Sequence, residues 1–141
     1  MTKNSGKATE KLFQQALKPH GKNVFLFRFD DAADIRGRTG VAGYTKSQPA
    51  DYLLTWYGET FYAEVKSCNN PRRFPFSQIR TSQRAAAKMQ GAAGGAYWIY
   101  VYSLVNERWY RMPWQVVAAL EDRGTKSREW DQSWEYDFEA V

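Results

Sequence analysis

The amino-acid sequence predicts an α/β (α+β) fold in which a central mixed β-sheet is flanked by helices. Helix-type and strand-type patterns follow one another in the order helix, strand, hairpin, helix, strand, strand, helix, which favours a sheet covered by helices. The run AYWIYVYSL at 96–104 is almost continuously apolar, as is typical of a central strand. The chain has 141 residues, of which 43% are hydrophobic, so we expect residues 1–141 to form a single domain around one core.

The first half of the chain contains a helix, a strand and a hairpin. ATEKLFQQALK (8–18) has its apolar residues at helical spacing and is followed by a helix-ending Pro-His-Gly sequence. NVFLFRFD (23–30) has the pattern of a strand. DYLLTW (51–56) and FYAEVKS (61–67) flank the short turn YGET and therefore predict a hairpin. Between the strand and the hairpin, residues 31–48 include the basic, glycine-rich RGRTGVAG, which we expect to protrude as a loop or stalk.

The second half alternates helices and strands. After the hairpin, CNNPRRFPF makes an irregular basic crossing to a helix, SQRAAAKMQ, which Thr81 or Ser82 can cap and which stops at Gly91. The apolar strand at 96–104 and a further strand, RWYRM, come next. Pro113 then opens a helix, WQVVAALEDR, because proline is tolerated in the first helical turn. Residues 122–141 form an acidic, aromatic tail that we expect to pack back on the domain.

Several kinds of site and location are excluded by residues that the sequence lacks. Cys68 is the only cysteine and His20 the only histidine, so an internal disulfide and Cys/His zinc sites are excluded. A Ser-His-Asp triad would have to use His20, which stands in the helix-ending turn. The glycine-rich segment is not a P-loop, because Tyr44 and Thr45 stand directly before Lys46. The chain has neither an apolar run that could cross a bilayer nor a signal core, so we expect a soluble intracellular protein without a membrane partner.

The charge is distributed unevenly along the chain. The formal net charge is +5, yet residues 1–117 hold 17 of the 20 basic residues and 8 of the 15 acidic ones. The remaining 3 basic and 7 acidic residues lie in 118–141. A basic body favours a phosphate-rich partner, because lysine and arginine gain affinity for DNA or RNA by releasing counterions. Simple solubility is the alternative explanation of this charge.

Two carboxylates and a lysine are the residues best suited to catalysis. Side chains two apart share one face of a strand, so Tyr62, Glu64 and Lys66 point the same way. The hairpin brings Asp51, at the start of its first strand, beside Glu64. These carboxylates can bind Mg²⁺, and the Lys66 ammonium can orient a water or stabilise the charge of a phosphoryl-transfer transition state. Glu-x-Lys is also a common exposed ion pair worth about 0–1 kcal/mol, but the Pro-Ala-Asp sequence upstream and the basic chain favour phosphodiester hydrolysis.

Four stretches occur in an order that is informative as a set: GKATEKLFQQAL with Glu10, GYTKSQPADYLLTWYGETFYAEVKS, FPFSQIRTSQ ending in Gln83, and GGAYWIYVY. Together they resemble the PD-(D/E)XK nuclease superfamily and, within it, Holliday junction resolvases of the RecU and Hjc type. The resemblance implies a restriction-endonuclease-like core in which Asp51 and Glu64 bind Mg²⁺, with Mn²⁺ as a substitute. It implies that Lys66 assists the attacking water, that Glu10 is an accessory acid, and that Gln83 orients Lys66 or the substrate.

The resemblance also implies a biological role, an endodeoxyribonuclease that resolves branched DNA during recombination and repair. It implies a homodimer, since two opposed nicks call for two like sites, and a cytoplasmic location in a prokaryotic or phage-infected cell. A restriction- or repair-type nuclease on duplex or single-stranded DNA and a non-catalytic nucleic-acid-binding module remain alternatives. The residues expected to contact DNA phosphates are Arg36, Arg38, Lys46, Arg72, Arg73, Arg80, Arg84 and Lys88. For Arg84 and Lys88, a solvated helix face is the alternative to DNA binding.

Overall fold

The computed structural model describes residues 5–30 and 48–140 of the chain. The predicted protruding segment at 31–48 lies almost wholly outside the described residues, and with it Arg36, Arg38 and Lys46. Within the described ranges, no helix has the length and apolar character that crossing a membrane requires. The helices and strands are α1 (Ser5–Leu17), η1 (Lys18–Asn23), β1 (Val24–Arg28), β2 (Tyr52–Trp56), β3 (Glu59–Cys68), β4 (Arg73–Pro75), η2 (Phe76–Gln78), α3 (Thr81–Ala92), β5 (Tyr97–Ser103), β6 (Arg108–Pro113), α4 (Trp114–Asp122) and β7 (Ser127–Glu129).

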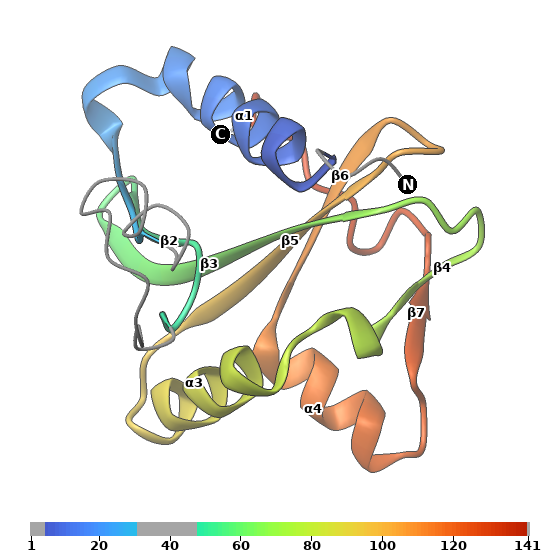
Figure 1. The fold of residues 1–141 in the computed structure, drawn as a ribbon. Helices are drawn as coiled ribbons and strands as arrows, with labels where there is room; N and C mark the ends of the chain where they lie inside the picture. The colour runs from blue at the N-terminus through green and yellow to red at the C-terminus, as the bar shows by residue number, and fades with distance from the viewer. Residues whose placement is uncertain (1–4, 31–47, 141) are drawn as a thin grey trace, which may run out of the picture.

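The central sheet has five strands in the order β1-β2-β3-β5-β6, and it is mixed, as predicted. The β3–β5 pair is parallel, whereas β1–β2, β2–β3 and β5–β6 are antiparallel. Parallel neighbours need a crossover connection, and here it contains β4, η2 and α3. Figure 1 shows α1 on one side of the sheet and α3 with α4 on the other, so helices cover both faces.

Two clusters of buried apolar side chains fill the spaces between the sheet and its helices. On the α1 side, Phe13 is fully buried and packs between the rings of Tyr52 and Tyr100, with centroids 5.3 and 5.0 Å away. On the side of α3 and α4, residues such as Ile99 and Val117 are fully buried. Because β3 lies between both clusters, its polar side chains cannot all reach solvent.

The burial of β3 changes the expected character of one of its faces. Alternation along the strand places Phe61, Ala63 and Val65 in the core, as the sequence indicates. On the opposite face, which holds Glu64 and Lys66, Gln83 of α3 contacts the Glu64 carboxylate, and Glu64 is only 1% exposed. An exposed Glu64–Lys66 ion pair is therefore ruled out as the explanation of this sequence.

The crossing after the hairpin is more regular than expected. Its residues Arg73–Pro75 form the short strand β4, which pairs antiparallel with β7 from the C-terminal tail. The helix α3 then begins after Arg80, so Thr81 and Ser82 lie in its first turn and do not cap it. Instead, the Arg80 N–H donates a hydrogen bond of 2.9 Å to Gln83 Oε1, which satisfies one of the amides that an α-helix leaves free at its start.

The C-terminal tail packs against the domain through its aromatic residues. Trp134 and Phe138 are 3% and 5% exposed, and they lie on the two different core clusters. Trp130 and Trp134 stack with their centroids 5.3 Å apart. The Arg111 guanidinium lies between the rings of Trp98 and Tyr136, at 4.1 and 4.0 Å from their centroids, and so joins the tail to the sheet.

Candidate active site

Asp51 and Glu64 come together because β2 and β3 are a regular antiparallel pair. Tyr52 is opposite Ala63 in the register, which leaves Asp51 as the next residue outward, beside Glu64. There the Asp51 N–H donates to Glu64 Oε1 at 3.1 Å, and the Val65 N–H donates to Asp51 Oδ2 at 2.9 Å. Each carboxylate is thus held by the backbone of the other strand, which fixes both side chains in position.

Two further side chains converge on the second oxygen of Glu64. Lys66 Nζ lies 3.2 Å from Glu64 Oε2, and Gln83 Nε2 donates a hydrogen bond to the same atom. Gln83 reaches this position from the first turn of α3, where its Oε1 is already bonded to the Arg80 N–H. The structure therefore places Gln83 on Glu64, the carboxylate that Lys66 also contacts.

Glu10 enters the same region from α1. Its Oε1 accepts a hydrogen bond of 3.0 Å from the Tyr52 hydroxyl, which in turn accepts one of 2.9 Å from Gln14 Nε2. Arg28 Nε, at the end of β1, lies 3.6 Å from the same Glu10 oxygen. The helix α1 thus holds the Glu10 carboxylate beside the hairpin, and the Tyr52 hydroxyl connects the two.

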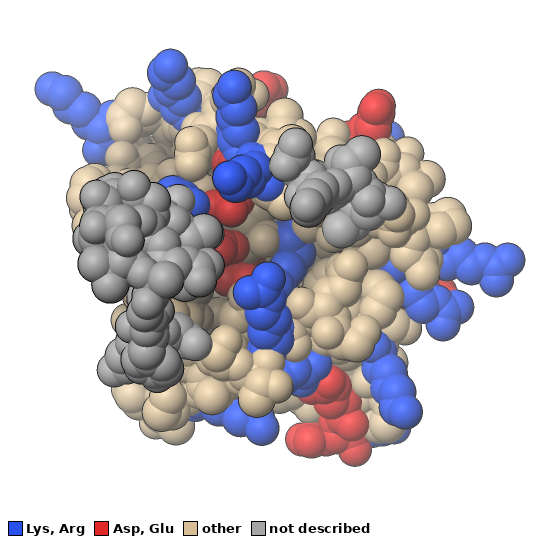
Figure 2. All heavy atoms as spheres, in the orientation of Figure 1, with Lys and Arg blue, Asp and Glu red and all other residues tan. Residues whose placement is uncertain are grey.

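The carboxylates Glu10, Asp51 and Glu64 line one cleft of about 390 Å³. All five predicted catalytic residues contribute to its wall, together with Arg80 and Gln78. Figure 2 shows acidic side chains at the bottom of a hollow, with lysine and arginine side chains around its edge. A negatively charged floor with a basic rim is the arrangement expected of a site in which a cation meets a phosphate.

The carboxylates of the cleft resist ionisation. Burial, followed by the repulsion of Asp51, raises the pKa of Glu64 to about 8, against the opposing effect of Lys66. Burial also raises the pKa of Asp51, and burial followed by the Asp51 charge raises that of Glu10. Three carboxyl groups therefore share the positive charge of Lys66 and Arg28, and added positive charge would favour the ionised forms.

The side chains present fit a divalent cation bound mainly by water and by two carboxylates. Across residues 5–30 and 48–140, no group of three or more His, Cys, Asp or Glu side chains is arranged to hold a metal ion. Mg²⁺ does not require such a group, since it keeps several waters and binds through one or two carboxylates. Asp51 and Glu64 supply those oxygens, and Gln78, which also lines the cleft, has a buried amide oxygen that accepts no hydrogen bond from any described residue.

The basic residues predicted to bind DNA are not equivalent. Arg72, Arg80 and Lys88 are exposed, and Arg80 stands at the cleft itself. Arg73 is also exposed, with Glu129 at 3.9 Å. These four remain candidates for phosphate contacts.

The sequence suggests that Arg84 either contacts DNA or lies on a solvated helix face, and its position in the structure differs from both. Its guanidinium donates to the carbonyls of Ile79 and Phe76, at 3.1 and 2.6 Å, and to Glu121 at 2.7 Å. Every nitrogen of the group is thus bonded within the fold. Arg84 therefore links the start of α3 to α4.

Sequence reasoning missed three residues at the site: Arg28, Tyr52 and Gln78. Arg28 and Tyr52 are register partners on neighbouring strands, so their proximity to Glu10 follows only from the packing of α1 on the sheet. The sequence does show that the segment around Gln78 is anchored, because Phe76 and Ile79 are apolar. What the sequence lacks is any sign that this segment places its glutamine in the wall of the same cleft as Asp51 and Glu64.

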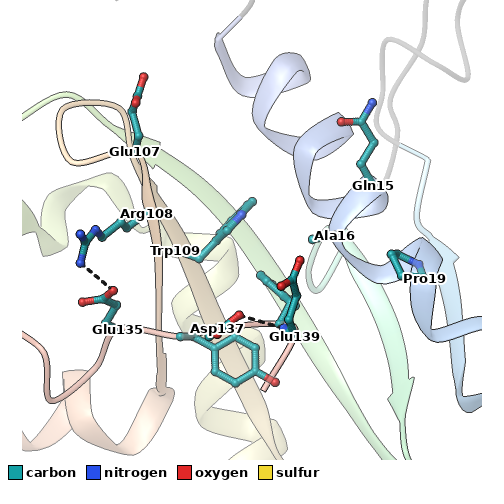
Figure 3. A pocket seen from close by; sticks show the side chains of 11 residues that line it. Gln15, Ala16, Pro19, Glu107, Arg108, Trp109, Glu135, Asp137 and Glu139 are labelled. Atoms are coloured by element: carbon teal, nitrogen blue, oxygen red, sulfur yellow. Dashed lines mark hydrogen bonds and ion pairs between the residues drawn. The ribbon is translucent and has the colours of Figure 1, made fainter. Parts of the chain in front are cut away.

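A second pocket, of about 410 Å³, lies at the other end of α1 and has a different charge (Figure 3). Gln15 and Ala16 contribute from the helix, and the acidic side chains come from the β5–β6 turn and the tail. Arg108 is the one basic residue lining it and forms a 3.0 Å ion pair with Glu135. The acidic residues are Glu107, Glu135, Asp137 and Glu139. Such a surface repels phosphates.

Comparison with known proteins places this arrangement in a structural context. No protein-family model matches the sequence. No curated protein matches it either. Among solved structures, the chain resembles Hjc of Archaeoglobus fulgidus, a Holliday junction resolvase from an archaeal hyperthermophile, with 16% sequence identity and a TM-score of 0.53. The match covers 91% of this chain and 89% of Hjc. The resemblance predicted from the four stretches is thereby confirmed at the level of the fold: the chain has the fold of the Hjc resolvase over nearly its whole length.

Proposed function

We propose that this protein is a metal-dependent endodeoxyribonuclease that cleaves branched DNA, with the Holliday junction as its substrate. The observation that carries the proposal is the convergence of Asp51, Glu64 and Lys66 in one cleft, with Lys66 Nζ 3.2 Å from a carboxylate that is 1% exposed. Burying this charged set costs stability, and such a cost is typical of functional sites. The shared fold with the Hjc resolvase supports a nuclease reaction at this position.

The residues of the cleft divide the work of phosphodiester hydrolysis. Asp51 and Glu64 would hold Mg²⁺ or Mn²⁺, which supplies positive charge to the phosphate and increases the acidity of water. Gln83 and the backbone of Asp51 hold Glu64 in position. The Lys66 ammonium, which is 15% exposed, donates hydrogen bonds to the charge that develops on the phosphoryl oxygens. Glu10, bonded to Tyr52, adds negative charge on the α1 side of the cleft and orients water there.

A preference for DNA shape over DNA sequence suits the charged rim. Arg80 and the exposed Arg72 can bind phosphates, and such contacts position a duplex without reading its bases. A four-way junction needs two opposed nicks, so we propose that the active form is a symmetric homodimer with one cleft per subunit.

The test is cleavage of a labelled four-way junction in Mg²⁺ by the wild type, Asp51→Asn and Glu64→Gln. We expect paired nicks from the wild type and at least a hundredfold slower cleavage by both variants, because each loses one carboxylate of the cleft. Glu59→Gln, on the exposed part of β3, is the matched control and should cleave normally. Unchanged cleavage by either cleft variant would refute the assignment of the site.

Two other outcomes of the same assay identify the alternatives. Equal rates on the junction and on a linear duplex of the same sequence would indicate a nuclease of the restriction or repair type. Binding with a steep salt dependence, but with no product at any Mg²⁺ or Mn²⁺ concentration, would indicate a non-catalytic nucleic-acid-binding module.

A further inference from the structure

Gln78 lies in the wall of the cleft but has no role in the site as described so far. It is the last residue of η2, between β4 and α3. Its neighbours Phe76 and Ile79 are 1% and 3% exposed, and both their carbonyls accept hydrogen bonds from Arg84. The backbone that carries Gln78 is therefore anchored on both sides, and its side chain stands on a rigid support.

The side-chain oxygen of Gln78 is buried and has no hydrogen-bond partner. Within residues 5–30 and 48–140, Gln78 Oε1 is the one buried side-chain nitrogen or oxygen in this condition. A buried acceptor without a donor destabilises the folded state, and nearly all such atoms in proteins are satisfied. Because the residue Gln78 also lines a cleft with three carboxylates, the candidate partners are groups that enter with the reactants.

The chemistry of the cleft restricts what that partner can be. Gln78 Oε1 accepts hydrogen bonds and cannot donate, so ionised carboxylates and DNA phosphates, which are also acceptors, cannot satisfy it. Lys66 Nζ and Gln83 Nε2 are directed to Glu64 Oε2, and no described donor reaches Gln78 Oε1. Of the reactants of the proposed hydrolysis, the water molecule and the phosphate, only the water carries a hydrogen-bond donor.

We propose that Gln78 is a positioning residue whose Oε1 accepts a hydrogen bond from water of the hydrated divalent cation that Asp51 and Glu64 would hold. The inference rests on the proposed function, because it requires that cation. It assigns to Gln78 the orientation of one water molecule, whose O–H the amide oxygen would hold.

The decisive variant is Gln78→Met, which keeps the length of the side chain and removes the acceptor. We expect the metal-free variant to melt at the same temperature as the wild type or higher, because an unsatisfied buried oxygen is removed. We expect its affinity for Mn²⁺, measured by isothermal titration calorimetry, to fall about tenfold, which is the value of one hydrogen bond to a charged group. Cleavage should slow in kcat, while KM for the junction stays unchanged.

Two companion variants make the result specific. Gln78→Glu keeps an acceptor oxygen at the same place, so it should bind Mn²⁺ at least as tightly as the wild type. Gln15→Met makes the same chemical change on the exposed part of α1, outside the cleft, and should alter neither the melting temperature nor Mn²⁺ affinity.

Each result that contradicts the proposal has a separate meaning. Wild-type Mn²⁺ affinity in Gln78→Met would overturn the role of Gln78, while loss of binding in Asp51→Asn would leave the proposed function intact. A clear drop in the melting temperature of metal-free Gln78→Met would show that the glutamine is structural and would also overturn the inference. Absence of Mn²⁺ binding by the wild type would refute this inference and the proposed function together.

Discussion

The burial of Glu64 predicts that the metal-free protein loses stability as the pH rises. The folded state raises the pKa of this carboxyl to about 8, from an ordinary value of 4.5, mainly through burial and then through the Asp51 charge. Between these two values the folded protein binds more protons than the unfolded chain. Stability that is present below pH 4.5 is therefore lost progressively as the pH rises through this window.

The size of the effect follows from the same two values. Each pH unit of the window corresponds to about 1.4 kcal/mol, so ionising Glu64 lowers the free energy of unfolding by about 5 kcal/mol in all. Glu64→Gln removes the buried charge and so avoids this loss of stability, but it also leaves Lys66 without its anion. We expect the unpaired Lys66 to offset about half of the stability that the substitution gains. At pH 8 the variant should then be more stable than the wild type by about 2 kcal/mol.

The assay is urea denaturation in EDTA at pH values from about 5 to 9, with Glu59→Gln as a control for a general change of net charge on the same strand. The quantity of interest is the difference in free energy of unfolding between Glu64→Gln and the wild type at each pH. Mg²⁺ should restore wild-type stability at high pH and leave Glu64→Gln unchanged. A difference that does not grow between pH 5 and 8 would refute the reasoning.

Three further variants test the other assignments. Arg84→Ala should lower the free energy of unfolding by about 2–4 kcal/mol in urea denaturation, because it leaves two carbonyls and a carboxylate without their donor; a change only in DNA affinity would contradict this. Lys88→Ala, one turn further along α3, should keep wild-type stability and reduce the salt slope of DNA binding by about one; an unchanged slope would remove Lys88 from the interface. Arg111→Ala should cost about 2 kcal/mol by thermal or urea denaturation, since it removes a guanidinium from between Trp98 and Tyr136, and a stable variant would show that the tail is held by its own aromatic residues.

The carboxylates of the cleft repel one another and are held in fixed positions. Asp51 and Glu64 are fixed by each other's strands, and Gln83 is fixed by the start of α3. None of these groups needs to move to form the site, so the repulsion between the two carboxylates is stored in the folded protein. Binding of a cation would release it, which couples metal affinity to stability at neutral pH.

Much of the site was predictable from local sequence because a hairpin imposes its own geometry. Once FYAEVKS and DYLLTW pair across a short turn, Asp51 must lie beside Glu64, and the alternation of the strand must put Lys66 on the same face. The element types were predictable for a similar reason, since helical and strand periodicity are properties of short segments. Even Gln83 could be identified from the order of the stretches.

Only the tertiary structure decided how the cleft is closed and what its charges cost. The pairing of β4 with β7 joins segments about fifty residues apart, and no local pattern marks such partners. Glu64 is buried among residues from outside the hairpin, among them Gln83 of α3, and this burial makes its carboxyl group resist ionisation. The bonds of Arg84 to Phe76 and Glu121 and the missing donor at the Gln78 oxygen also depend on contacts between elements. Local sequence determined which groups meet in the hairpin, and long-range packing determined their environment, because burial is a property of the whole fold.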